Sequence, residues 1–244
     1  MLHTKQEAPL NYKFGFITDA SPIKPLNFSG LVLECQFDQD NYQDDLFSKL
    51  GIQFPSEITH AYKKRKAEFL AGRYCAHLAL SYFGLMNTPI PIGPNRSPLW
   101  PADIAGSITH ADNLAICAIN NKPQALGIDY EPTIAINTAN EIKSHIINRA
   151  EEALLSKSGL PFRQWMTIAF STKESLFKAL YPTVKQYFDF LDAEIVHIDC
   201  KNHKLVLTIK CDLCTAVSKG QLFSGTYRSH REGIITLVEH QEFL

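Results

Sequence analysis

Hydrophobic side chains recur with a helical period in three long stretches of the chain. Ser56 is suited to cap the start of the first stretch, and Gly84 to end it. The third stretch is expected to stop before Pro182, because the residue before a proline disfavours helical geometry. The predicted helices span about 56–82, 139–157 and 162–180.

Shorter apolar runs bounded by turn residues predict strands in the rest of the chain. Two of these runs flank the turn 120–123, so we expect them to form an antiparallel hairpin. A helix followed by a hairpin then occurs in both halves, which predicts an α+β fold. The expected strands lie at 14–17, 31–33, 114–119, 125–131, 193–199, 204–210, 221–228 and 233–239.

The chain has 244 residues, of which 45% are hydrophobic and 20% are charged. This is the composition of an ordinary globular protein. The formal net charge of −1 argues against a general nucleic-acid binder. No apolar run is long enough to span a bilayer. Residues 1–12 lack the apolar core of a secretory signal, so we expect a cytoplasmic protein.

One group of cysteines resembles a zinc motif. Cys200 and His203, followed by Cys211 and Cys214, have the spacing of zinc ligands. The segment between the two pairs reads as a single strand of roughly 20 Å, which is too long for both pairs to reach one ion. We therefore expect reduced cysteines rather than a structural zinc site.

Two acidic residues end the apolar run that begins at Ala125. Because side chains alternate along a strand, Asp129 and Glu131 share one face while Tyr130 lies on the other. The simpler interpretation is a strand end in solvent. Two carboxylates on one face of a buried strand would instead require a cation nearby.

The helix predicted over 162–180 carries charges on an otherwise apolar surface. Glu174 and Lys178 are four residues apart and share a face, and Lys173 precedes them. Charges on a buried helix are costly unless they meet a partner or a ligand. The charges on this helix are therefore explained equally well by a bound ligand and by an ion pair exposed to solvent.

Several cations lie in the N-terminal half. Arg65 and Arg73 belong to the first predicted helix, Arg96 lies in a proline-rich loop, and His110 lies at the acidic end of the expected hairpin. A solvated basic surface is the simpler interpretation of the helix. Together with the three acids, however, these cations predict a Mg²⁺ site, with Mn²⁺ as a substitute, for a substrate bearing several phosphates.

Five segments carry a resemblance to a known family. They are 65–73 (RKAEFLAGR), 96–101 (RSPLWP), 106–110 (GSITH), 127–131 (GIDYE) and 170–179 (FSTKESLFKA). In this order they resemble the 4'-phosphopantetheinyl transferases, in particular the enterobactin-synthase-associated branch of the surfactin-type class. The resemblance covers residues 60 to 182. Tyr130 replaces an aliphatic residue of the family, and Thr109 stands where this branch often has serine.

The resemblance implies transfer of 4'-phosphopantetheine from coenzyme A to a serine of an apo acyl or peptidyl carrier protein. It also implies two similar α+β halves related by a pseudo-twofold axis, with the active site at their interface. The boundary would separate residues 1–135 from 136–244. One chain would form the whole site, so we expect a monomer.

The resemblance further implies roles for individual residues. Asp129, Glu131 and Glu174 would hold Mg²⁺, and Glu174, with Glu131 as the competing candidate, would act as the general base. Lys178 would neutralise the leaving group, and Lys173 would hold the diphosphate. The residues implied at the 3'-phosphate and adenine end are Arg65, Arg73, Arg96, Thr109 and His110.

Two alternatives have different functions on the same fold. One is a Mg²⁺-dependent hydrolase of a nucleotide diphosphate, which would release adenosine bisphosphate without a carrier. The other is a non-catalytic module that binds coenzyme A, although such a module has no need for three acids. The sequence leaves the carrier and its pathway open.

Overall fold

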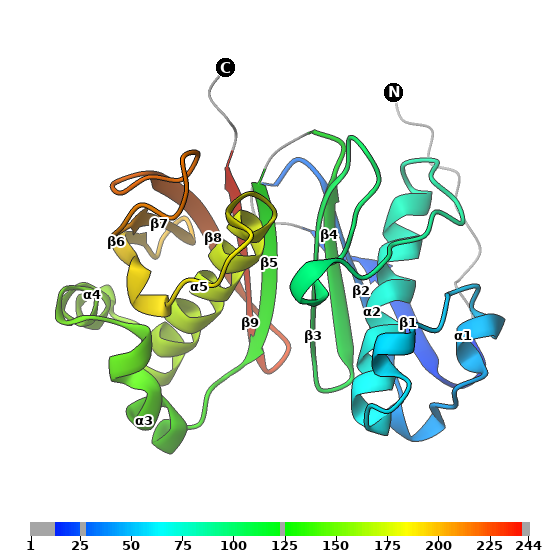
Figure 1. Cartoon of the computed structure of the whole chain (residues 1–244). Helices are drawn as coiled ribbons and strands as arrows, with labels where there is room; N and C mark the ends of the chain where they lie inside the picture. The colour runs from blue at the N-terminus through cyan, green and yellow to red at the C-terminus, as the bar shows by residue number, and fades with distance from the viewer. Residues whose placement is uncertain (1–12, 25–27, 123–124, 241–244) are drawn as a thin grey trace, which may run out of the picture.

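Two antiparallel sheets pack face to face, and each has a long helix on its outer side (Figure 1). This computed structural model describes residues 13–24, 28–122 and 125–240. The layers run helix, sheet, sheet, helix, which confirms the α+β class. No helix among these residues is long and apolar enough to cross a membrane. The expectation for residues 1–12 lies outside the described ranges.

The first sheet has the strand order β1-β2-β4-β3. Its outer face packs against helix α2 (Lys63–Ser81) through small and apolar side chains such as Leu70 and Cys75. A short helix, α1 (Leu46–Lys49), precedes α2. The strands are β1 (Ile17–Pro22), β2 (Leu31–Phe37), β3 (Ala105–Ala111) and β4 (Leu114–Asn120).

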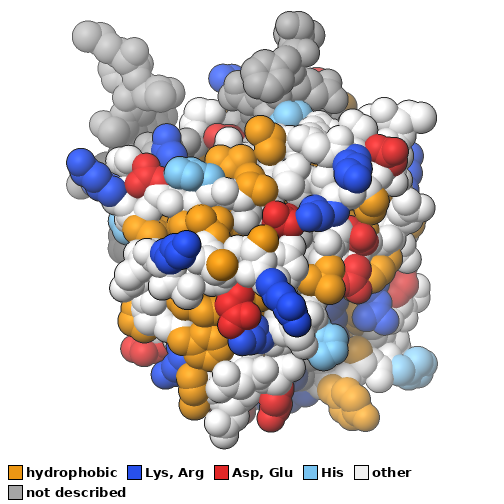
Figure 2. All heavy atoms as spheres, turned by 90° about the vertical axis from the view of Figure 1, so that its left-hand side faces the viewer, with side chains coloured by type: hydrophobic (Ala, Val, Ile, Leu, Met, Phe, Trp, Pro, Cys, Tyr) orange, Lys and Arg blue, Asp and Glu red, His pale blue; other side chains and the backbone are white. Residues whose placement is uncertain are grey.

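The second sheet has the order β5-β9-β8-β7-β6 and packs against helix α5 (Phe162–Val184). Helices α3 (Ile136–Ile146) and α4 (Arg149–Leu155) connect β5 to α5. On the face over this half, acidic, basic and apolar side chains are interspersed (Figure 2). The strands are β5 (Ala125–Pro132), β6 (Ala193–Asp199), β7 (Lys204–Ile209), β8 (Leu222–His230) and β9 (Gly233–His240).

A third apolar cluster lies between the two sheets. Val32 and Ile116 of the first sheet meet Ile128, Tyr130 and Ile235 of the second. Tyr130 is therefore a packing residue, as its place between the two acids predicts. Its burial on the inner face leaves Asp129 on the opposite face of β5, toward α5.

Side-chain hydroxyls join the edges of the two sheets. The Ile128 N–H donates to Ser107 Oγ at 3.0 Å, and the Tyr130 N–H donates to Thr109 Oγ1 at 3.3 Å. Backbone donors on the free edge of β5 are thereby satisfied without a continuous sheet. These hydrogen bonds place β3 beside β5, the strand that carries Asp129 and Glu131.

The predicted hairpin of 114–119 with 125–131 is wrong. Strand β4 pairs with β2 and β3, whereas β5 pairs with β9. Between β4 and β5 the chain passes from the first sheet to the second. The second sheet therefore begins at β5, earlier than the boundary expected at 135 and 136, and the division into two domains stays a prediction.

Helix ends differ from the sequence prediction in three places. The segment predicted to open the first helix is a separate 3₁₀ turn, Ser56–Ile58, and α2 begins at Lys63. The predicted helix 139–157 is two helices, because Asn148 has extended geometry and its side chain caps α4. Helix α5 runs through Pro182 to Val184. The four C-terminal strands lie where the sequence predicts them.

Candidate active site

A close approach of β5 and α5 creates the acidic end of the site. A Cβ at Gly127 would lie 1.8 Å from the carbonyl oxygen of Ser175, so only glycine allows this contact. Two residues further on, Asp129 points the same way and meets the helix. The glycine of the acidic motif thus brings Asp129 and Glu131 to the helix that carries Glu174.

The Asp129 carboxylate receives three side-chain hydrogen bonds. Thr109 Oγ1 and Lys178 Nζ donate to Oδ1 at 3.0 and 2.7 Å, and Ser171 Oγ donates to Oδ2 at 2.8 Å. Lys178 Nζ also donates to the Ile128 carbonyl at 3.1 Å. Asp129 is 6% exposed, so these donors replace the water that it lost on folding.

Glu131 and Glu174 are half-buried beside Asp129. Burial, together with the charges of Asp129 and Glu174, raises the pKa of Glu131 to about 7. Burial also raises the pKa of Glu174, although the ammonium of Lys178 opposes that rise. Crowded carboxylates of this kind take up either a proton or a cation. A pKa near neutrality also suits a general base.

The acid cluster matches Mg²⁺ in its chemistry but is not arranged as a coordination sphere. Among the described ranges no three His, Cys, Asp or Glu side chains are grouped so as to hold a metal ion. The physical reason lies at Asp129, whose two oxygens are taken by Lys178 and two hydroxyls. Hard carboxylate oxygens that repel one another nevertheless fit a small divalent cation, provided that Asp129 releases Lys178.

A basic pocket of about 250 Å³ lies in the N-terminal half, lined by Arg65, Arg96, Tyr62 and Phe69 among others. Arg65 Nη1 lies 3.0 Å from Nε2 of His110, which β3 presents toward α2. The cations predicted from α2, the proline-rich loop and β3 therefore come together.

The loop that carries Arg96 is fastened to the other half of the molecule. Asn95 and Arg96 both have positive φ, at 51° and 65°. Asn95 Nδ2 donates to the Tyr181 hydroxyl of α5 at 2.6 Å, and that hydroxyl donates to the Pro94 carbonyl at 3.3 Å. Such backbone geometry persists where surrounding contacts determine it. Helix α5 thus positions both Glu174 and the loop of Arg96.

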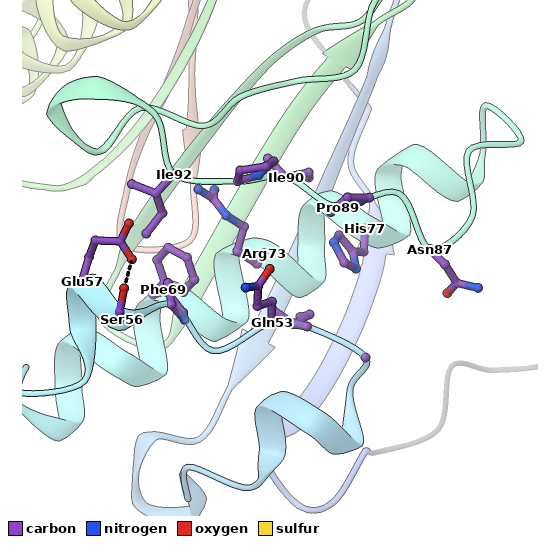
Figure 3. Close-up of a pocket in the computed structure, with 14 residues that line it drawn as sticks. Gln53, Ser56, Glu57, Phe69, Arg73, His77, Asn87, Pro89, Ile90 and Ile92 are labelled. Carbon is purple, nitrogen blue, oxygen red and sulfur yellow. Dashed lines mark hydrogen bonds between the residues drawn. The ribbon is translucent and has the colours of Figure 1, made fainter.

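Arg73 lies in a neighbouring pocket of about 330 Å³ (Figure 3). Its guanidinium stacks on Phe69, with 4.7 Å between its carbon and the ring centroid. Arg73 is 6% exposed, and its Nε has no hydrogen-bond partner among the described residues. Burial lowers the pKa of Arg73 to about 10, so the charge remains at neutral pH. A buried cation on the wall of a pocket is suited to bind an anion that enters that pocket.

Lys173 is not brought to the acid cluster. Its Nζ lies 2.8 Å from Glu151 Oε1 and donates to the carbonyls of Ile146, Phe190 and Ala193 at 2.7 to 3.0 Å. It is 2% exposed. The expectation that Lys173 holds a diphosphate is corrected accordingly, because these acceptors already occupy its three protons.

Three further residues were missed by the sequence analysis. Ser171 holds Asp129, Glu151 neutralises Lys173, and Glu68 faces His110 with 3.6 Å between its Oε2 and Nδ1. Ser171 lies one helical turn before Glu174, so a hydroxyl on the buried face of that helix was the available signal. The other two act across elements and leave no local pattern.

Comparisons with known proteins show which family the chain resembles over most of its length. Residues 54–120 match the model of the 4'-phosphopantetheinyl transferase N-terminal domain, and residues 125–230 match that of the 4'-phosphopantetheinyl transferase superfamily. The chain is 39% identical to enterobactin synthase component D of Escherichia coli over 217 residues, which covers 88% of this chain and 96% of that protein.

Two further relatives match a shorter part of the chain at lower identity. The chain is 32% identical over 140 residues to 4'-phosphopantetheinyl transferase PptT of Mycobacterium tuberculosis, covering 57% of this chain and 61% of that protein. It is 33% identical over 151 residues to 4'-phosphopantetheinyl transferase Svp of Streptomyces mobaraensis, covering 60% and 61%.

The chain belongs to the 4'-phosphopantetheinyl transferase superfamily. Within it, the extent of the match places the chain in the branch of enterobactin synthase component D. It is accordingly an enzyme that transfers the 4'-phosphopantetheine group of coenzyme A to a carrier protein.

Proposed function

We propose that Asp129, Glu131 and Glu174 bind Mg²⁺ together with the diphosphate of coenzyme A. The observation that supports this most directly is the crowding of these acids in a partly buried place: burial first, and then the charges of Asp129 and Glu174, raise the pKa of Glu131 to about 7. A bound Mg²⁺ supplies positive charge to the diphosphate oxygens. If Asp129 were one of the ligands of the cation, Lys178 would be released from its contact with Asp129.

Glu174 acts as the general base in this proposal. It accepts the proton of the carrier serine, directly or through a water molecule, while the serine oxygen bonds to the phosphorus next to pantetheine. The bond from that phosphorus to the bridging oxygen breaks, and adenosine 3',5'-bisphosphate leaves with the electron pair. Glu131 is the competing base, because its raised pKa suits the same role.

Lys178 stabilises the charge that develops on the departing bisphosphate. Its Nζ lies 2.7 Å from Asp129, and its side chain is 27% exposed, so it is within reach of a ligand. Positive charge placed where negative charge develops is worth several kcal/mol in the transition state.

The 3'-phosphate and adenine end of coenzyme A occupies the basic pockets. Arg65 and Arg96 line one pocket, His110 contacts Arg65, and Arg73 lines the next pocket. Thr109 has a different role from binding the 3'-phosphate and adenine end, which the family resemblance implies for it. Its hydroxyl donates to Asp129 and accepts from the Tyr130 N–H, so it holds the acid in place.

The carrier is proposed to be a peptidyl carrier domain of a siderophore synthetase. This rests on the enterobactin synthase named for the relative that the chain matches over 96% of its length. A monomeric state and a cytoplasmic location are part of the same proposal.

The test uses apo carriers of peptide, polyketide and fatty-acid synthases, coenzyme A and Mg²⁺. We expect the peptidyl carrier to gain the mass of one phosphopantetheine group fastest. Glu174→Gln should remove the gain while the circular dichroism spectrum and melting temperature stay near those of the native protein. Full activity of that variant would exclude Glu174 as the base, and equal activity without divalent cations would exclude the metal site.

A further inference from the structure

The tip of the proline-rich loop has a backbone geometry that an arginine seldom adopts. Asn95 and Arg96 follow one another in the left-handed region, with φ of 51° and 65°. Asparagine tolerates this region, whereas a long side chain such as that of arginine is uncommon there. The residue in the disfavoured geometry is also the one that lines the basic pocket with Arg65. Contacts around the tip must therefore hold it in place.

Backbone hydrogen bonds close the loop upon itself. The Gly93 N–H donates to the Ser97 carbonyl at 2.7 Å, and the Arg96 N–H donates to the Gly93 carbonyl at 3.2 Å. These bonds join residues of the same turn to one another. They shape the turn, but they do not fix where its tip lies relative to the rest of the molecule.

The Tyr181 hydroxyl connects the tip to helix α5. It accepts a hydrogen bond from Asn95 Nδ2 at 2.6 Å and donates one to the Pro94 carbonyl at 3.3 Å. The hydroxyl thus binds the two residues that precede Arg96. Its ring is 9% exposed and packs on Phe177, with 5.7 Å between the ring centroids. A packed ring therefore presents the hydroxyl to the loop at a fixed place.

Tyr181 shares one face of α5 with two residues of the acidic end. Glu174, Lys178 and Tyr181 are spaced i, i+4 and i+7, which places them along one side of the helix. The proposed mechanism gives roles to the first two and none to the hydroxyl of the third. The same helix face thus runs from the acid cluster to the loop of Arg96.

We propose that Tyr181 is a positioning residue for recognition of the 3'-phosphate of coenzyme A, because it holds residues 94–96 where Arg96 lines the pocket. This inference rests on the proposed function of that pocket. Without the hydroxyl, the tip leaves this geometry for part of the time. The apparent affinity for the phosphate then falls with the fraction of molecules in which Arg96 is in place. Tyr181 therefore acts on binding of the nucleotide rather than on the chemical step.

The first experiment compares the native protein with Tyr181→Phe, which keeps the packed ring and removes the hydroxyl. Amide hydrogen exchange at Arg96 should become faster, because the tip opens more often. Affinity for adenosine 3',5'-bisphosphate should fall about threefold to tenfold, as for one lost neutral hydrogen bond. Affinity for 3'-dephospho-coenzyme A and kcat at saturating coenzyme A should stay the same. Tyr82→Phe, at a tyrosine that is 55% exposed, is the matched control and should change none of these quantities.

Asn95→Gly removes the same hydrogen bond from the side of the loop and leaves the Tyr181 ring untouched. Glycine adopts positive φ without strain, so the turn itself can still form. We expect a similar loss of bisphosphate affinity, and Tyr181→Phe should add little to it in this background. Unchanged amide exchange at Arg96 in Tyr181→Phe would overturn the proposal, and so would an equal loss of affinity for 3'-dephospho-coenzyme A.

An Arg96→Met background separates control of the loop from general support of α5. If Tyr181 acts through Arg96, Tyr181→Phe should have no further effect on bisphosphate affinity in this background. The same loss there would overturn the proposal. Arg96→Met alone tests the pocket. If it leaves bisphosphate affinity unchanged while exchange at Arg96 is faster in Tyr181→Phe, the pocket assignment fails and the hold of Tyr181 on the loop stands.

Discussion

The acidic and basic ends of the site differ in how the protein itself meets their charges. Asp129 receives three internal hydrogen bonds, one of them from the ammonium of Lys178. Arg73 is as deeply buried, yet one of its donors has no partner among the described residues. Arg65 faces a neutral imidazole rather than a carboxylate at its 3.0 Å contact. The fold therefore satisfies Asp129 internally and leaves a donor of the equally buried Arg73 without a partner among the described residues.

The same contrast separates two lysines on one helix. Lys173 is sealed among Glu151 and three carbonyls, whereas Lys178 is partly exposed and contacts Asp129 and one carbonyl. Both lie in the segment that resembles the family motif. Their positions in the helix, five residues apart, turn them to different sides. One of them is consequently buried inside the fold, and the other is partly exposed beside the acid cluster.

The largest expected effect is the loss of stability in Lys173→Met. Removal of the ammonium leaves the Glu151 carboxylate buried without its cation, and breaking such a pair costs about 3 to 5 kcal/mol. Because Glu151 also accepts the N–H groups of Asn148 and Ile195, the start of α4 and strand β6 should loosen together. Urea denaturation followed by circular dichroism measures the change.

The matched double variant Lys173→Met, Glu151→Leu should recover part of that loss, because no charge is left unpaired. A near-native unfolding free energy for Lys173→Met alone would contradict the buried ion pair of Lys173 and Glu151.

Lys178→Met should show the opposite pattern. We expect transfer activity to fall by about two to three orders of magnitude, the usual cost of removing one group that stabilises transition-state charge. The unfolding free energy should fall less than in Lys173→Met, since Lys178 is the partly exposed partner and Asp129 keeps the hydrogen bonds of Thr109 and Ser171. Single-turnover rates with saturating coenzyme A and apo carrier measure the effect. Equal activity of Lys178→Met and the native enzyme would contradict a role for this ammonium in the reaction.

Part of the acid cluster could be predicted from the sequence, because strand alternation and helix period are local properties, whereas the meeting of the strand and the helix was implied by the family resemblance. Asp129 and Glu131 share a face, and Glu174 lies on a helix whose apolar residues predict its burial. Strand β3 was missed, since Ser107 and Thr109 on one of its faces resemble a loop. Their hydroxyls have a partner only when β5 of the other sheet lies alongside.

Lys173 shows the limit of motif reasoning. Its counterion, Glu151, lies 22 residues earlier in another helix, where its local role is to complete the capping box of α4. No periodicity links the two residues. Only the packing of α4 against α5 and β6 brings them together, so sequence alone presents Lys173 as one more cation for a phosphate.

Arg73→Met tests the basic end with a smaller effect. The variant keeps the apolar stem over Phe69 and removes the charge and the free donor. The KM for coenzyme A should rise about tenfold, since one charge-assisted hydrogen bond is lost, while kcat stays within about twofold. Steady-state kinetics with saturating carrier give both quantities. A fall in kcat at unchanged KM would place Arg73 with the acidic end instead.

The smallest expected effect is a pH dependence of stability that originates in Glu131. Its pKa is raised from 4.5 to about 7, so between these values the folded state binds more protons than the unfolded state. The free energy of unfolding contributed by this group therefore falls as pH rises through that window. The contribution of His110 to the pH dependence of stability has the opposite sign, because its pKa is lowered to about 4 and the unfolded state binds more protons between pH 4 and 6.5.

The difference between the native protein and Glu131→Gln isolates the contribution of the Glu131 carboxyl. Glu131→Gln should gain stability relative to the native protein from pH 5 to pH 8. Melting temperatures across this range, with the exposed Glu57→Gln as control, measure it. A constant difference would show that Glu131 ionises normally and that the acids do not repel one another.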